Sequence, residues 1–169
     1  MTENSSKNYK KAEFKWDTCI PSKYVSIEFL DFLYEQFPLQ RSIWHGPDHW
    51  IRVLENGRSL TKETGANLEV VELFALIHDC RRENENYDLE HGFRSGDFSR
   101  TLNGTWFDLN KDDLEELVYA CHWHSHGHTT GTPTVMTCWD SDRLDLGRVG
   151  KKPLPEYLCT DAAKARCSP

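Results

Sequence analysis

The sequence has no long hydrophobic run and no excess of positive charge. Its longest apolar stretch, Val70 to Ile77, is interrupted by Glu72 and is far shorter than the roughly 20 residues that a membrane-spanning helix needs. Lys and Arg number 20 and Asp and Glu 27, so the formal net charge is -7, whereas a surface that follows nucleic-acid phosphates needs a basic stripe. We therefore expect neither a membrane protein nor a binder of nucleic-acid polymers.

Signals for export, for disulfides and for several enzyme classes are missing as well. The polar N-terminus has no apolar segment typical of a secretory signal, and the six cysteines never form a Cys-x-x-Cys pair. These absences favour reduced thiols and a cytoplasmic protein. No nucleophile elbow, Walker loop, H-E-x-x-H zinc motif or dinucleotide fingerprint occurs.

Hydrophobic residues recur at helical spacing along most of the chain, and no segment alternates as a strand would. The 169 residues suffice for one domain with a full core. We predict an all-α, single-domain helical bundle over residues 22–150, preceded by a polar, frayed segment (1–21) and followed by a C-terminal extension (151–169). The predicted helices begin and end near 22–37, 47–65, 68–79, 91–102, 111–121 and 133–146.

All eight histidines lie between positions 45 and 128. Histidine is the commonest metal ligand of proteins, and carboxylates join it for divalent ions, although any single histidine is equally explained by packing or solvent exposure. Two placements favour a metal site. Asp142 continues the apolar stripe of the last predicted helix, whereas Asp140 and Asp145 point off it, and His78-Asp79 closes the most apolar helix. A carboxylate buried without a cation costs several kcal/mol.

The order of these residues resembles that of the HD-domain metal-dependent phosphohydrolases. The family pattern H…HD…D is matched by His49, His78, Asp79 and Asp142. Three segments strengthen the likeness, which spans about residues 42–160: HGPDHWIRV, ALIHDCRRENE and CWDSDRLDLGRVG. The resemblance implies a helical bundle of the HD-domain type with one or two divalent metal ions (Mn, Mg, Ni, Co, Zn or Fe), the first held by the four matched residues.

The first and last ligands follow from their neighbours in the sequence. His49 rather than His45 matches the family's first ligand, because it precedes the -xxRV- sequence that follows that ligand. Independently, His45 lies outside the predicted helix, so the direction of its side chain is less fixed. Asp142 matches the acid before a basic-Leu dipeptide, in agreement with its place on the apolar stripe. Asp140 is expected as a hydrogen-bond partner of a metal ligand.

Two-metal members of the family place further histidines between the HD pair and the last aspartate. His91 and His124 match those places best, and Asp79 would then bridge the two ions. His91 also has a simpler interpretation as a residue at a helix start. The histidines that compete with His124 are His122, His126 and His128. Only His124 lies three residues beyond Cys121, on the inward edge of its helix.

The resemblance also implies which residues take part in catalysis. Asp79 would act through the metal, which activates a water molecule. Arg82 stands where several branches of the family carry Glu, His or Lys near the substrate phosphate. A guanidinium cannot serve as a general base, but it binds phosphate through two parallel hydrogen bonds. His45 and Arg52 are further candidates for substrate binding, and Arg94 is a weaker one.

The implied function is a metal-dependent phosphohydrolase acting on a small phosphate ester such as a nucleotide. Two alternatives stay open. Some HD-like proteins are di-iron oxygenases, with which the histidine-rich ligand set is compatible, and a non-catalytic, metal-stabilised binding module is the other. The sequence leaves open the substrate, the metal and the oligomeric state, and a homo-oligomer is compatible with it.

Overall fold

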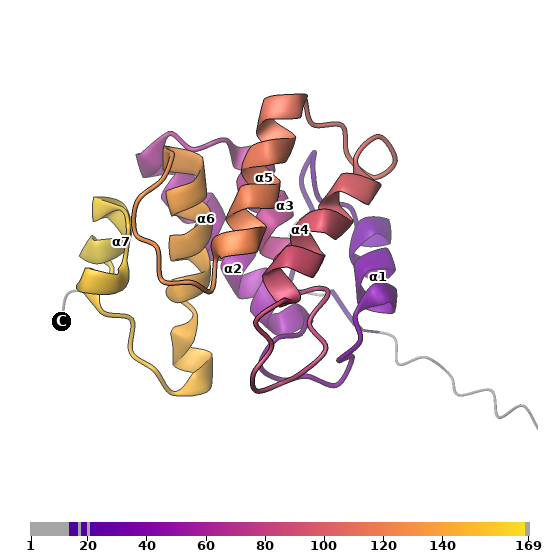
Figure 1. Cartoon of the computed structure of the whole chain (residues 1–169), viewed down its shortest axis with the longest axis horizontal. Helices are drawn as coiled ribbons and strands as arrows, with labels where there is room; N and C mark the ends of the chain where they lie inside the picture. The colour runs from indigo at the N-terminus through magenta and orange to yellow at the C-terminus, as the bar shows by residue number, and fades with distance from the viewer. Residues whose placement is uncertain (1–13, 17, 20, 168–169) are drawn as a thin grey trace, which may run out of the picture.

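The structure is a computed structural model that describes residues 14–16, 18–19 and 21–167. Within these residues the chain forms helices and no strand, which confirms the predicted all-α fold (Figure 1). The elements are α1 (Ile27–Gln36), α2 (Pro47–Thr64), α3 (Leu68–Ile77), α4 (His91–Leu102), α5 (Lys111–Trp123), α6 (Pro133–Arg143), the 3₁₀-helices η1 (Leu146–Val149) and η2 (Pro155–Tyr157), and α7 (Asp161–Ala165). None of the described helices combines the length and the apolar character that crossing a membrane requires.

The most apolar helix, α3, lies at the centre of the bundle. Every residue from Val70 to Cys80 is buried, and α3 packs mainly against α2, α5 and α6 and less extensively against α1 and α4. Figure 1 shows α1 at one edge of the molecule and α7 at the opposite edge, with α4 and α5 packed together between them. Because other helices surround α3, the residues that follow its last turn lie inside the protein.

Side-chain caps set most helix starts where the sequence predicts them. Asn110 accepts hydrogen bonds from the backbone of α5, and Thr132 accepts one from the Val135 N–H of α6. Two boundaries differ from the prediction by three residues or more. Ser26 caps α1, so that helix begins at Ile27, five residues later than predicted, and α6 ends at Arg143 instead of continuing to 146.

The described part of the N-terminal segment belongs to the core, so the expectation of a frayed segment is wrong there. Trp16 and Cys19 are 7% and 8% exposed, and Trp16 Nε1 donates a hydrogen bond to Asp31 Oδ1 on α1 at 2.7 Å. One indole buries a large apolar area whatever its neighbours in the sequence are. The rest of the predicted segment, residues 1–13, 17 and 20, lies outside the described residues.

Asp140 anchors the C-terminal extension to α6. Its carboxylate is fully buried and accepts hydrogen bonds of 2.8 Å from the backbone N–H groups of Cys159 and Thr160 and from the Thr160 hydroxyl. Two residues along a helix turn the side-chain direction by about 200°, so Asp140 and Asp142 point to opposite sides of α6. The expectation that Asp140 supports a metal ligand is therefore wrong.

Candidate metal centre

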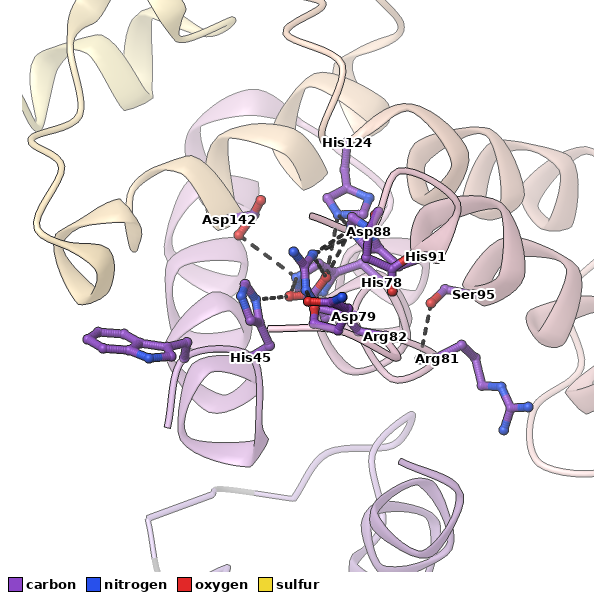
Figure 2. Close-up of polar contacts among 12 residues, drawn as sticks. His45, His78, Asp79, Arg81, Arg82, Asp88, His91, Ser95, His124 and Asp142 are labelled. Atoms are coloured by element: carbon purple, nitrogen blue, oxygen red, sulfur yellow. Dashed lines mark hydrogen bonds and ion pairs between the residues drawn. The ribbon is translucent and has the colours of Figure 1, made fainter. Parts of the chain in front are cut away.

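The six side chains that the sequence proposes as metal ligands lie in one cluster inside the bundle, and Figure 2 labels all of them except His49. Five are buried, and the Asp142 side chain is 13% exposed. They come from five places in the fold: His49 from the first turn of α2, His78 and Asp79 from the end of α3, His91 from the start of α4, His124 from the end of α5, and Asp142 from α6. The bundle thus brings together residues that are up to 93 positions apart in the sequence.

The first set of donor atoms consists of two imidazole nitrogens and two carboxylate oxygens. His49 Nε2 lies 3.1 Å from His78 Nε2, 3.3 Å from Asp142 Oδ1 and 3.7 Å from Asp79 Oδ2. His78 Nε2 lies 3.8 Å from each of the same two carboxylate oxygens. Nitrogen and oxygen ligands about 2.0–2.2 Å from one ion are separated by about 3.0–3.6 Å. These four residues therefore have the spacing to hold one ion with little movement.

A second set of donors surrounds the other oxygen of Asp79. Asp79 Oδ1 lies 3.2 Å from His91 Nε2 and 3.6 Å from His124 Nε2, and these two nitrogens are 2.9 Å apart. Each oxygen of Asp79 thus faces a different pair of histidines. A carboxylate in this position could contribute one oxygen to each of two metal ions.

Hydrogen bonds fix the tautomer of all four histidines. Each Nδ1 approaches an oxygen that can only accept a hydrogen bond, so each Nδ1 carries the proton and each Nε2 presents a lone pair to the cluster. The acceptors are Asp145 Oδ2 for His49 at 2.7 Å, the Phe74 carbonyl for His78 at 3.1 Å, the Asp88 carbonyl for His91, and the Cys121 carbonyl for His124 at 2.7 Å.

Histidine lone pairs face each other at two places in the cluster. Two Nε2 lone pairs that face each other at about 3 Å repel unless a proton or a metal ion lies between them, and this occurs twice, in the pairs His49–His78 and His91–His124. Among the described residues, Asp79 Oδ1 and Asp142 Oδ1 are buried and have no hydrogen-bond partner. Because an unpaired buried acceptor is costly, the donor set fits divalent cations.

The pKa values in the cluster reflect burial and mutual attraction. Burial lowers the pKa of His78 to about 3, so its imidazole is neutral near pH 7. Burial also opposes the ionisation of Asp79, but the neighbouring His78 and contacts with His124 and His45 hold the pKa of this carboxyl well below its ordinary value. Burial lowers the pKa of His49, but the nearby carboxylates of Asp142 and Asp145 outweigh burial and raise it.

Asp145 is the supporting residue that the sequence analysis missed. Besides accepting from His49, its carboxylate accepts a hydrogen bond of 2.7 Å from Arg52 Nε. The prediction placed Asp145 off the inward stripe because it assumed that the helix continued to 146. The helix ends at Arg143, and the chain then turns into η1, so Asp145 points toward α2.

The proposed substrate-binding residues are distributed around the cluster. His45 Nδ1 lies 2.9 Å from Asp79 Oδ2, and Arg82 Nη1 lies 3.7 Å from Asp79 Oδ1, so both border it. Arg52 contacts it through Asp145. Arg94 is bonded to Asp88 instead, at 2.6 Å, and holds the 81–90 loop. The three histidines that compete with His124 contact other groups: His122 lies near Asp97, and His126 and His128 lie against Trp123.

Gly92 allows the second set of donors to form. A Cβ atom at this position would lie 2.5 Å from the Cys121 carbonyl oxygen and 3.3 Å from His124 Cε1. Only a residue without a Cβ lets the start of α4 approach the end of α5 this closely. The His91-Gly92 pair therefore places His91 beside His124.

Comparisons with known proteins give the fold. No family model matches the sequence, and no curated protein does. A search of solved structures finds the crystal structure of a predicted HD superfamily hydrolase from an uncultured Thermotogales bacterium, with a TM-score of 0.67 and 23% sequence identity over 83% of this chain and 81% of that chain. This chain therefore has the fold of that HD superfamily hydrolase, and the likeness seen in the sequence motifs is confirmed at the level of the fold.

Proposed function

We propose that this protein is a metal-dependent phosphohydrolase of the HD superfamily. The observation that carries the proposal is the position of the Asp79 carboxylate between two pairs of histidines. Each of its two oxygens faces the Nε2 lone pairs of a different pair. The fold shared with an HD superfamily hydrolase supports the same conclusion. We assign His49, His78, Asp79 and Asp142 to a first metal ion, and His91, His124 and Asp79 to a second.

Bound divalent ions would supply Lewis acidity, which polarises a phosphoryl oxygen and activates water. The chain's own residues bind and orient the reactants. In the hydrolysis of a phosphate monoester, a bond forms between water oxygen and phosphorus, the bond from phosphorus to the leaving oxygen breaks, a proton from the water passes to that oxygen, and the alcohol and inorganic phosphate are released. Negative charge on the phosphoryl oxygens has to be held in place throughout, because the transition state spreads it over them.

We assign to Arg82 the role of holding one of those oxygens. Its Nε and Nη2 donate to the carbonyls of Asn84 and Asn86 at 2.9 and 3.2 Å, which fixes the guanidinium, and its Nη1 lies 3.2 Å from His91 Nε2 and 3.7 Å from Asp79 Oδ1. His45 approaches Asp79 from the other side and holds the orientation of its carboxylate. In Figure 2 the neighbouring Arg81 points away from the cluster, so we assign it no part in the reaction.

The proposal is tested by metal analysis and a substrate panel. Protein purified without added metal and then loaded with Mn, Co, Ni or Mg should bind up to two ions per chain and release phosphate from some small phosphate esters. Two tightly bound irons with a visible absorption band and no phosphate release would support a di-iron oxygenase, for which six histidine and aspartate ligands are also suitable. Bound metal without turnover of any compound would support a binding module.

A further inference from the structure

A third guanidinium borders the cluster on the side of Asp142. Arg148 lies in η1, and its side chain is 9% exposed. Its Nε donates a hydrogen bond of 2.7 Å to the Trp44 carbonyl, and its Nη1 donates one of 3.3 Å to the Asp145 carbonyl. Backbone carbonyls on two different loops thus hold the guanidinium in one position beside the cluster.

The guanidinium of Arg148 is close to carboxylates but hydrogen-bonded to none of them. Its Nη1 lies 3.6 Å from Asp142 Oδ1 and 3.9 Å from Asp145 Oδ2, and Asp142 Oδ1 has no hydrogen-bond partner among the described residues. Arg52 differs, because its Nε bonds directly to Asp145 at 2.7 Å and its side chain is 41% exposed. Arg148 is therefore the buried cation on this side that is free to take an anionic oxygen.

The charges of the site indicate how negative its ligand is. Asp79, Asp142 and Asp145 carry three negative charges, and the guanidiniums that contact them, Arg52, Arg82 and Arg148, carry three positive ones. With neutral imidazoles the protein groups cancel, so each divalent ion adds two charges that the protein does not balance. Because Asp142 would be shared between Arg148 and such an ion, a further anion beside Arg148 would be stabilised by both positive groups.

We infer that Arg148 is a substrate-binding residue that holds a phosphoryl oxygen on the Asp142 side of the centre and favours a dianionic phosphate monoester over a singly charged diester. This inference rests on the proposed function. Arg82 and Arg148 contact the cluster at different aspartates, Asp79 and Asp142. A phosphoryl group bound at the ions would thus meet one guanidinium near each.

The test compares Arg148→Met with Arg100→Met in metal-loaded protein. Arg100 pairs with Glu115 between α4 and α5, so its replacement makes the same change in charge away from the site. The probe is inorganic phosphate, with binding measured by isothermal titration calorimetry. Arg148→Met should weaken phosphate binding by about 10–100-fold, as expected for the loss of charge-assisted hydrogen bonds. Arg100→Met should match the wild type, and the metal content of both variants should be unchanged.

Measurements of enzyme activity test the predicted preference for monoesters over diesters. The kcat/KM of Arg148→Met for a phosphate monoester should fall by at least the same factor, and that for a diester should change by less than about threefold. Arg148→Lys keeps the charge without the paired donors and should show a smaller loss, and it carries the test if the Met variant fails to fold. Unchanged phosphate affinity in Arg148→Met and Arg148→Lys would overturn the inference. Loss of metal from these variants would also overturn it, because Arg148 would then be a positioning residue for Asp142. A wild-type protein without phosphohydrolase activity would instead overturn the proposed function.

Discussion

The Nδ1 of His49 lies 2.7 Å from Asp145 Oδ2, a contact between residues 96 positions apart that orients the imidazole and leaves its Nε2 free for a metal. Asp145→Ala should remove this orientation and weaken metal binding by about 10–100-fold, as is typical for partners of ligating histidines. Metal titration of the purified variant measures the change. Asp145→Asn, which keeps one acceptor oxygen, should lose less. Wild-type affinity in the Ala variant would show that His49 needs no such support.

Asp142 and Asp140 should separate metal binding from stability. Asp142→Asn should lose the first ion while the metal-free protein stays folded, because Asp142 Oδ1 makes no hydrogen bond to the described residues. Asp140→Asn should keep the metal and lower the free energy of unfolding by about 1–3 kcal/mol, because its bonds to Cys159 and Thr160 are weakened. Metal content and chemical denaturation of both variants check this. The opposite pattern would mean that Asp140, and not Asp142, lies on the face of α6 that binds the metal.

Helix types and most of the cluster follow from local sequence, because capping residues and helical periodicity act over a few positions. His124 could be chosen among four neighbouring histidines from its spacing to the buried Cys121. Asp145 could not be predicted, since its direction depends on where α6 ends. That end is decided by the chain after Arg143, including contacts between η1 and the Trp44 loop. The burial of Trp16 likewise depends on α1, which the polar neighbours of Trp16 do not reveal.

Gly92→Ala should disrupt the second ion more than the first. The added Cβ would clash with the Cys121 carbonyl, so α4 has to move away from α5 and His91 from His124. Metal stoichiometry should fall from about two to about one per chain. Gly147→Ala is the matched control, because a Cβ there meets no atom within 4 Å. Two ions retained in Gly92→Ala would show that the helices can separate without loss of the site.

The metal-free protein should lose stability as the pH falls from about 6.5. His78 has a pKa of about 3 in the folded state and an ordinary value of 6.5, so between these values protons bind the unfolded chain more readily. The contribution of neutral His78 to the free energy of unfolding is complete above pH 6.5 and declines as the pH falls toward 3. His78→Gln should therefore show a smaller loss of unfolding free energy between pH 6.5 and 4.5, measured by urea denaturation in the presence of a chelator. Parallel curves for the variant and the wild type would contradict a neutral, buried His78.

The most direct test of the metal centre is a crystal structure of metal-loaded protein with anomalous data collected at the absorption edge of the metal. We expect two peaks about 3.5–4 Å apart, each about 2.0–2.3 Å from its histidine Nε2 atoms. One ion should contact His49 and His78 and the other His91 and His124, with Asp79 between them. A single ion on the first set, with water beside His91 and His124, would contradict the two-metal assignment. Absence of any ion from these nitrogens at saturating metal would contradict the proposed centre as a whole.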